Sequence, residues 1–398
     1  MEFGETSKPG VIKVDPNKYL KVEVLKVDFS DSFKTANAKE NVTSSHWEKG
    51  KSDKELVDGF AYAKKPAVMA INKKSEATIT VKVESKGVSG DGILSGSFQG
   101  YYFEGKLPLS THEGKDVTVT LKEAPTSLTW LKGNILWTAE GGGFIEPSGK
   151  TYAEIFFVFN DPAKMDFFSE KGVWVEALRY LFERASVRGV KKEGEAIKKV
   201  TQCCFSIRYH KYDIVKGATS FGGLSKKFKL DRYISPIYSK VNCHDQAYAV
   251  VVLSGALGLD VDGLFMKPFG YLNLTQLVGR GSCNNPFPGR KHSKEMYRLS
   301  FTEEGIKQMK LKPPKPEHYL VVAGDDPDRS AFGNHSYCEY KSKIFDACAG
   351  PAVGDASREN YVITNVDSAT TLNTAYSAGK VEHIIRHESI GGTVKRVE

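Results

Sequence analysis

Residues 235–260 read SPIYSKVNCHDQAYAVVVLSGALGLD, and this stretch decides the class of fold. Asn242 is a good N-cap residue, because its side-chain oxygen can accept a hydrogen bond from the first turn of a helix. The run from Cys243 to Leu257 is apolar at helical spacing, and Gly258 is a natural end for such a helix. The pattern therefore predicts a largely buried helix that begins at Cys243.

The predicted place of Cys243 suits a nucleophile. In the first helical turn the unsatisfied N–H groups and the helix dipole stabilise a thiolate. The same N–H groups can stabilise an oxyanion that forms on a substrate. Taken alone, a buried cysteine is more often a core residue, so a catalytic role requires a base and a group that orients it.

The base that we predict is His335. The segments 332–340 (FGNHSYCEY) and 343–349 (KIFDACA) both look like short strands. If they form a hairpin with a four-residue loop around Tyr340-Lys341, His335 lies directly opposite Asp346 on one face. A carboxylate beside an imidazole orients the ring and stabilises its charged form. The sequence thus predicts a catalytic triad of Cys243, His335 and Asp346.

The other candidate base, His244, follows Cys243 directly in the sequence. Neighbouring residues on a helix do not face each other. Cys338 and Cys348 lie close to the predicted His335 and Asp346 strands, and packing is the role expected for both.

Two fragments carry a resemblance to a known family: CHDQAYAVVVLSGALGLDV from residue 243 and NHSYCEYKSKIFDACAGP from residue 334. They resemble the nucleophile helix and the histidine and aspartate strands of the transglutaminase-like branch of the papain-like cysteine protease superfamily, over residues about 235–350. The resemblance implies that Cys243 is the nucleophile, His335 the base and Asp346 the residue that orients it. It also implies a further side chain at the oxyanion hole, for which Gln202 is the nearest upstream glutamine.

One segment departs from the compact members of that family. The stretch between Cys243 and His335 is longer than they require, and it includes residues 274–293, rich in Gly, Pro, Asn and Arg. We expect this insertion to form a lid or a substrate loop.

The fold class expected for the whole chain is α+β. Segments 19–28, 77–84 and 116–121 alternate apolar and polar residues, as half-buried strands do, and turn-rich stretches separate them. They predict an N-terminal all-β sandwich. Residues 152–160 form a nearly continuous apolar run, which indicates a strand buried on both faces. Residues 173–184 show helical spacing.

With 398 residues, the chain is long enough for two domains. We predict a β-sandwich domain at 1–160, for binding or targeting, and a transglutaminase-like cysteine hydrolase domain at 165–398. In the second domain the helix that carries Cys243 packs against an antiparallel sheet.

The function that follows is a cysteine-dependent amide hydrolase or acyltransferase that works through a thioester on protein or peptide substrates. Protease, amidase acting on peptidoglycan peptides, deamidase and transglutaminase all remain open, because their chemistry is shared until the thioester is resolved. Two alternatives are an inactive relative that binds a partner, and a secreted toxin or effector.

Other classes are disfavoured by composition. The net charge of +8 is modest for this length, and the lysines are scattered, so no nucleic-acid partner is expected. The sequence contains no apolar run of about 18 residues, so no membrane span is expected. The start lacks a secretory signal, which favours a cytoplasmic protein or one exported without such a signal.

Neither a metal nor a cofactor is expected. The six cysteines form no C-x-x-C pair. His383 and His387 are spaced as ligands on a helix can be, but no third ligand is evident, and a surface helix is the expected structure there.

Overall fold

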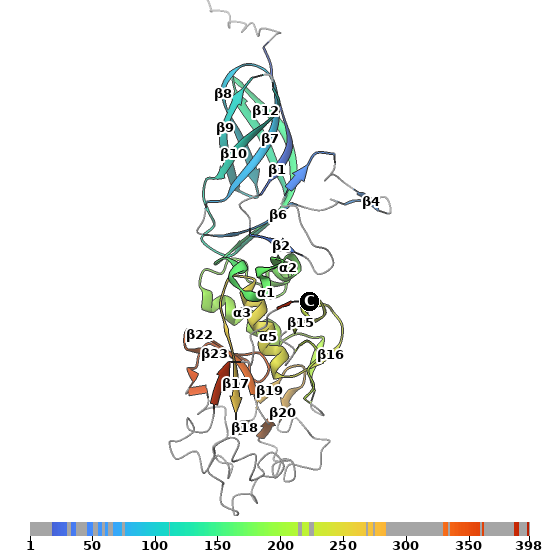
Figure 1. The fold of residues 1–398 in the computed structure, drawn as a ribbon, viewed down its shortest axis with the longest axis vertical. Coiled ribbons are helices and arrows are strands. Elements are labelled where there is room, and N and C mark those ends of the chain that lie inside the picture. Colours follow the sequence, from blue (N-terminus) through green and yellow to red (C-terminus); the bar gives the residue numbers. More distant parts are fainter. Residues whose placement is uncertain are drawn as a thin grey trace, which may run out of the picture.

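The computed structural model describes residues 18–29, 33–36, 46–50, 55–57, 60–62, 67–73, 76–110, 112–213, 217–222, 227–267, 270–273, 275–283, 329–332, 335–358, 360–361, 386–389 and 396–397. The curled sheet of the N-terminal half lies at one end of an elongated molecule (Figure 1). Helices occupy the middle, and a second, smaller sheet lies beyond them.

The N-terminal half is built on one nine-stranded sheet with the order β3-β1-β7-β10-β9-β8-β11-β12-β6. Its strands are β1 (Leu20–Asp28), β3 (His46–Glu48), β6 (Ala67–Asn72), β7 (Thr78–Gly87), β8 (Gly90–Phe98), β9 (Tyr101–Leu109), β10 (His112–Leu121), β11 (Thr129–Gly141) and β12 (Phe144–Val158). All neighbours are antiparallel except β12 and β6.

The predicted strands are present, but they form one curled sheet where two packed sheets were expected. The sheet twists until β1 contacts β12, and its buried residues then enclose one apolar core. Inward and outward residues alternate along a strand in both arrangements. The period of the sequence therefore predicts the strands and leaves the number of sheets open.

Strand β12 connects this core to the rest of the molecule, and its second half, from Ala153 to Val158, is buried on both faces, as predicted for residues 152–160. Ile155 and Phe157 belong to the core of the curled sheet, whereas Phe156 and Val158 belong to the core of the C-terminal half. The buried Glu154 on this strand accepts two hydrogen bonds from Arg179 of helix α2, at 2.9 and 3.0 Å. Strand β12 thus contributes side chains to both cores.

The chain changes from strands to helices after β12. The helices are η1 (Pro162–Lys164), α1 (Asp166–Ser169), α2 (Val175–Glu183), α3 (Glu193–Phe205), α4 (Leu230–Ile234) and α5 (Cys243–Gly255). Helix α2 confirms the helix expected at 173–184. None of the helices in the described part of the chain has the length and hydrophobicity to cross a membrane.

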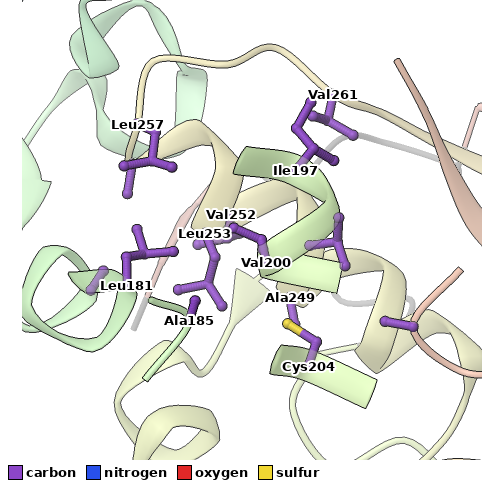
Figure 2. Packing of buried hydrophobic residues seen from close by; sticks show 14 of the residues in the cluster. Leu181, Ala185, Ile197, Val200, Cys204, Ala249, Val252, Leu253, Leu257 and Val261 are labelled. Carbon is purple, nitrogen blue, oxygen red and sulfur yellow. The ribbon is translucent and has the colours of Figure 1, made fainter. Parts of the chain in front are cut away.

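Helix α5 is the centre of the C-terminal half. Side chains of α5 such as Val252 and Leu253 pack between Leu181 of α2 and Val200 of α3 (Figure 2). The helix ends before Gly258, as predicted. Gly258 has φ of +73°, and a Cβ there would lie 2.1 Å from the carbonyl oxygen of Asn160.

The second sheet is five-stranded and antiparallel, with the order β24-β23-β22-β17-β25. Its strands are β17 (Asp262–Lys267), β22 (His335–Tyr340), β23 (Lys343–Asp346), β24 (Ala352–Val353) and β25 (Arg386–Ser389). Helix α5 packs against β22 and β17, as expected. The helix expected around His387 is wrong, because His387 lies in β25, which pairs with β17. His383 is outside the described residues.

Short strand pairs complete the fold. They are β2 (Thr35–Ala36) with β13 (Val173–Trp174), β4 (Glu55–Val57) with β5 (Phe60–Tyr62), β14 (His210–Tyr212) with β16 (Ser239–Val241), β15 (Lys227–Phe228) with β26 (Arg396–Val397), β18 (Gly270–Asn273) with β21 (Arg329–Phe332), and β19 (Thr275–Leu277) with β20 (Gly281–Cys283).

Candidate active site

Cys243 occupies the first position of helix α5, directly after the N-cap residue Asn242. The Asn242 side chain accepts a hydrogen bond of 3.1 Å from the backbone N–H of Asp245, and the Asp245 carboxylate accepts one of 3.3 Å from the backbone N–H of Asn242. This reciprocal capping box fixes the start of the helix. It therefore fixes the position of Cys243, which is only 3% exposed.

The Asp245 carboxylate also holds the loop at residues 219–221 against the helix. It accepts hydrogen bonds from the Thr219 hydroxyl at 2.6 Å and from the backbone N–H groups of Ser220 and Phe221 at 2.9 and 3.0 Å. Burial raises the pKa of Asp245, and these hydrogen bonds oppose that rise. The loop at residues 219–221 is thus attached to the first turn of α5.

The hairpin of β22 and β23 has a register that differs from the one predicted. Tyr340 pairs with Lys343, so the turn contains only Lys341 and Ser342, both with positive φ (49° and 61°). In this register Asp346 falls opposite Tyr337, and His335 is its diagonal neighbour. Because the shift amounts to two residues, the side chains keep their faces.

His335 and Asp346 are brought together despite this shift. The Nε2 atom of His335 lies 2.6 Å from Oδ2 of Asp346, and both side chains are fully buried. Diagonal pairs in an antiparallel sheet are close enough for side chains of this length to meet. The imidazole ring thus has its Nε2 committed to the carboxylate.

Asp346 is itself held by three further donors. Its Oδ2 accepts a hydrogen bond of 2.7 Å from the Tyr361 hydroxyl, and its Oδ1 accepts bonds of 2.7 and 3.1 Å from the backbone N–H groups of Cys348 and Ala349. A carboxylate with both oxygens satisfied in this way is rigid and remains an acceptor for the histidine.

The third candidate, Cys243, interacts with the same imidazole. Burial alone lowers the pKa of His335, but the charge and hydrogen bond of Asp346, together with those of Cys243, raise it to about 10. The protonated imidazole is therefore the favoured form at neutral pH. A thiolate beside a protonated imidazole is the ion pair that activates cysteine nucleophiles.

The Gln246 side chain also connects helix α5 to the end of β23, the strand that carries Asp346. The Gln246 amide donates to the backbone oxygens of Ala347 at 2.8 Å and Cys204 at 2.9 Å, and its oxygen accepts from the Tyr233 hydroxyl at 2.8 Å. The side chain is fully buried. It therefore holds α5, α3 and the end of β23 in one arrangement.

Sequence reasoning missed Tyr361, Gln246 and the second role of Asp245. The signal for Asp245 was available, because an acidic residue three positions after an N-cap marks a capping box. Nothing in the sequence pointed to Tyr361, which follows Asp346 by 15 positions and reaches it only through the path of the chain after β24.

Cys338 and Cys348 pack in the interior, as expected. Cys338 donates to the backbone oxygen of Ala247 at 3.3 Å and is buried against α5. Cys348 is buried in the loop that follows Asp346, and its backbone N–H donates to the Asp346 carboxylate. The ring of His244 meets the Ser336 hydroxyl at 3.1 Å. Gln202 is exposed on α3, and the structure gives it no place at the site.

The insertion after Cys243 begins with β19 and β20. The backbone of this segment meets the end of the aspartate hairpin, with Val278 N–H donating to Cys348 at 3.1 Å and Gly350 N–H donating to Gln276 at 3.0 Å. Residues 284–293 of the expected lid lie outside the described residues. The described part of the insertion therefore supports the loop that holds Asp346.

No family model matches the chain, and no curated protein matches it. Among solved structures, a transglutaminase of red sea bream is similar, with a TM-score of 0.31 and 8% identity over 72% of this chain. The match covers 49% of that transglutaminase, so the chain spans about half of its length.

Proposed function

We propose that this protein is a cysteine-dependent amide hydrolase or acyltransferase that uses Cys243, His335 and Asp346. The observation that carries the proposal is the His335 imidazole, held by Asp346 at 2.6 Å and in contact with a cysteine at the first position of a helix. The order Cys, His, Asp along the chain and the packing of α5 on β22 support the same assignment.

In the proposed reaction the Cys243 proton resides on His335, and the thiolate attacks the carbonyl carbon of a peptide bond or of a glutamine side chain. The backbone N–H group of Cys243, at the first position of α5, stabilises the oxyanion, whereas that of Asp245 already donates to Asn242. His335 then protonates the leaving amine, the C–N bond breaks and a thioester forms on Cys243. Water or a second amine resolves the thioester and returns the proton to the imidazole.

Thiol labelling of the native protein tests the nucleophile. Cys203 is a good internal reference because it is more exposed than Cys243, and burial raises the pKa of its thiol. We expect iodoacetamide to modify Cys243 faster than Cys203 at pH 6, as located by peptide mass mapping. The His335→Ala variant should slow the labelling of Cys243 and leave Cys203 unchanged. A Cys243 that reacts no faster than Cys203 contradicts the proposal.

The second step is tested with a glutamine peptide, with and without a primary amine. Amine incorporation indicates a transglutaminase, ammonia release alone a deamidase, and a new peptide N-terminus a protease. The Cys243→Ala variant is the control, and it should lack whichever activity the parent protein shows.

A second candidate function is a binding module that has lost catalysis, and the near-complete burial of Cys243 favours it. In that case the three residues would be a remnant of the site. The labelling experiment separates the two functions, because a remnant cysteine that is buried and not activated stays unmodified at pH 6 and at pH 8.

A further inference from the structure

A cavity of about 650 Å³ lies where the two halves of the molecule meet, and none of the three candidate catalytic residues lines it. Its walls come from the ends of β6 and β12, the first turns of α3, the turn between β22 and β23, and β24. The buried rings of Phe159 and Phe345 form part of the lining. A cavity of this size accepts a small molecule.

The charge of the lining is strongly positive. The lining contains two glutamates, Glu193 and Glu195, and six lysines, which are Lys73, Lys191, Lys192, Lys198, Lys341 and Lys343. Lys341 is paired with Glu193 at 2.6 Å. Within the described residues, Lys191, Lys192, Lys198 and Lys343 form no ion pair. Like charges that gather around a concavity focus an electrostatic field in it.

The lysines come from three separate parts of the chain. Lys73 follows β6 of the curled sheet and lies over the Phe159 ring at 4.8 Å, while its ammonium group donates to the backbone oxygen of Thr126 at 3.0 Å. Lys191 and Lys192 precede α3, and Lys343 begins β23. The fold therefore gathers charges that repel one another, and a bound anion would offset that repulsion.

We propose that this cavity binds a small anion with two or more phosphate groups. Ammonium groups from several directions suit phosphate oxygens, for which lysine acts as a point charge. The occupant would join the curled sheet, α3 and the hairpin that carries His335 and Asp346. Binding itself does not depend on the proposed enzymatic function, and only an effect of the anion on that activity would rest on it.

Calorimetry with inorganic tripolyphosphate tests the proposal on the full chain carrying Cys243→Ala, with sodium chloride at equal ionic strength as the blank. We expect saturable binding, and weaker binding of citrate. The double variant Lys191→Ala/Lys343→Ala should weaken the affinity for tripolyphosphate at least tenfold. The matched control Lys106→Ala/Lys150→Ala, which removes two exposed lysines of the curled sheet, should leave it unchanged.

A variant that is expected to strengthen binding controls for effects of lost structure. Glu193→Gln removes a negative charge and releases Lys341 from its ion pair, so it should tighten the binding several-fold. Absence of heat beyond the salt blank, equal binding by the lysine double variant, or weaker binding by Glu193→Gln overturns the site. Citrate that binds as tightly as tripolyphosphate overturns the phosphate assignment. Each readout is independent of whether Cys243 is a nucleophile.

Discussion

Two buried aspartates flank the candidate nucleophile, and the difference between them separates structure from chemistry. Asp245 and Asp346 are both fully buried, and each accepts four hydrogen bonds. All donors to Asp245 are backbone N–H groups or a threonine hydroxyl. Asp346 accepts from an imidazole that can gain or lose a proton. The same carboxylate thus serves as a structural anchor in one place and as the partner of a titrating group in the other.

The largest difference between the two aspartates is expected in the activities of their Asp→Asn variants. In Asp346→Asn the amide oxygen can still accept from the N–H groups of Cys348 and Ala349, while the amide nitrogen faces His335 and favours its unprotonated Nε2. We expect the rate of Cys243 acylation to fall by roughly 10²–10⁴-fold, the range for loss of an acid–base function. Single-turnover kinetics with a glutamine peptide measure this rate.

Asp245→Asn should behave in the opposite way. Both carboxylate oxygens accept from N–H or O–H donors, so an amide nitrogen must face at least one backbone N–H. We expect a loss of about 2–3 kcal/mol in the free energy of unfolding, since a buried donor becomes unsatisfied. Once the folded fraction is corrected for, acylation should change less than tenfold. Equal kinetic losses in the two variants would remove the distinction between the aspartates.

A pH series of unfolding extends the comparison to two buried histidines. The pKa of His335 is raised to about 10, so its protonated form adds stability that is complete below its ordinary pKa and is lost as the pH rises toward 10. The advantage of the parent protein over His335→Gln should shrink by a few kcal/mol between pH 6 and pH 10.5, on the scale of about 1.4 kcal/mol per pKa unit. Urea unfolding at each pH measures the difference.

His210 is the control, because its contribution to stability should change with pH in the opposite direction. Burial lowers its pKa, its Nε2 lies 2.8 Å from the backbone oxygen of Tyr233, and its ring packs against Phe221, which the Asp245 loop positions. The protonated form is disfavoured in the folded state. The parent protein should therefore lose stability relative to His210→Gln as the pH falls below about 6.5. Parallel pH dependences for the two histidines would contradict this assignment.

The sequence predicted the Asp245 side of the site better than the Asp346 side, and the reason is distance along the chain. An N-cap and the start of a helix are local properties, so Asn242 and the position of Cys243 follow from a few neighbouring residues. The hairpin register depends on its turn, and Lys341 and Ser342 adopt positive φ without the Gly or Asn that usually marks such a turn. His335 and Asp346 still share one face of the sheet because the predicted register was wrong by two residues, which is an even number.

Dependence on residues far apart in the chain also explains why the sequence did not predict how the N-terminal sheet closes. Alternation along β1, β7 and β10 predicts strands with one buried face, and those strands are present. Whether the faces close onto a second sheet or onto the same sheet depends on twist accumulated over nine strands. The contact of β1 with β12 joins segments more than 100 residues apart. No local pattern encodes such a contact.

The smallest and most closely matched test removes one hydroxyl donor from each aspartate. Tyr361→Phe deletes the 2.7 Å bond to Asp346, and Thr219→Val deletes the 2.6 Å bond to Asp245. Each should cost about 1 kcal/mol of stability, the usual net value of one hydrogen bond. Tyr361→Phe should in addition change the pH dependence of Cys243 labelling, because it alters the carboxylate that stabilises the protonated imidazole. Thr219→Val should leave that profile in place. If both variants shift the profile equally, the loop at residues 219–221 belongs to the catalytic machinery, and the two aspartates form a single site.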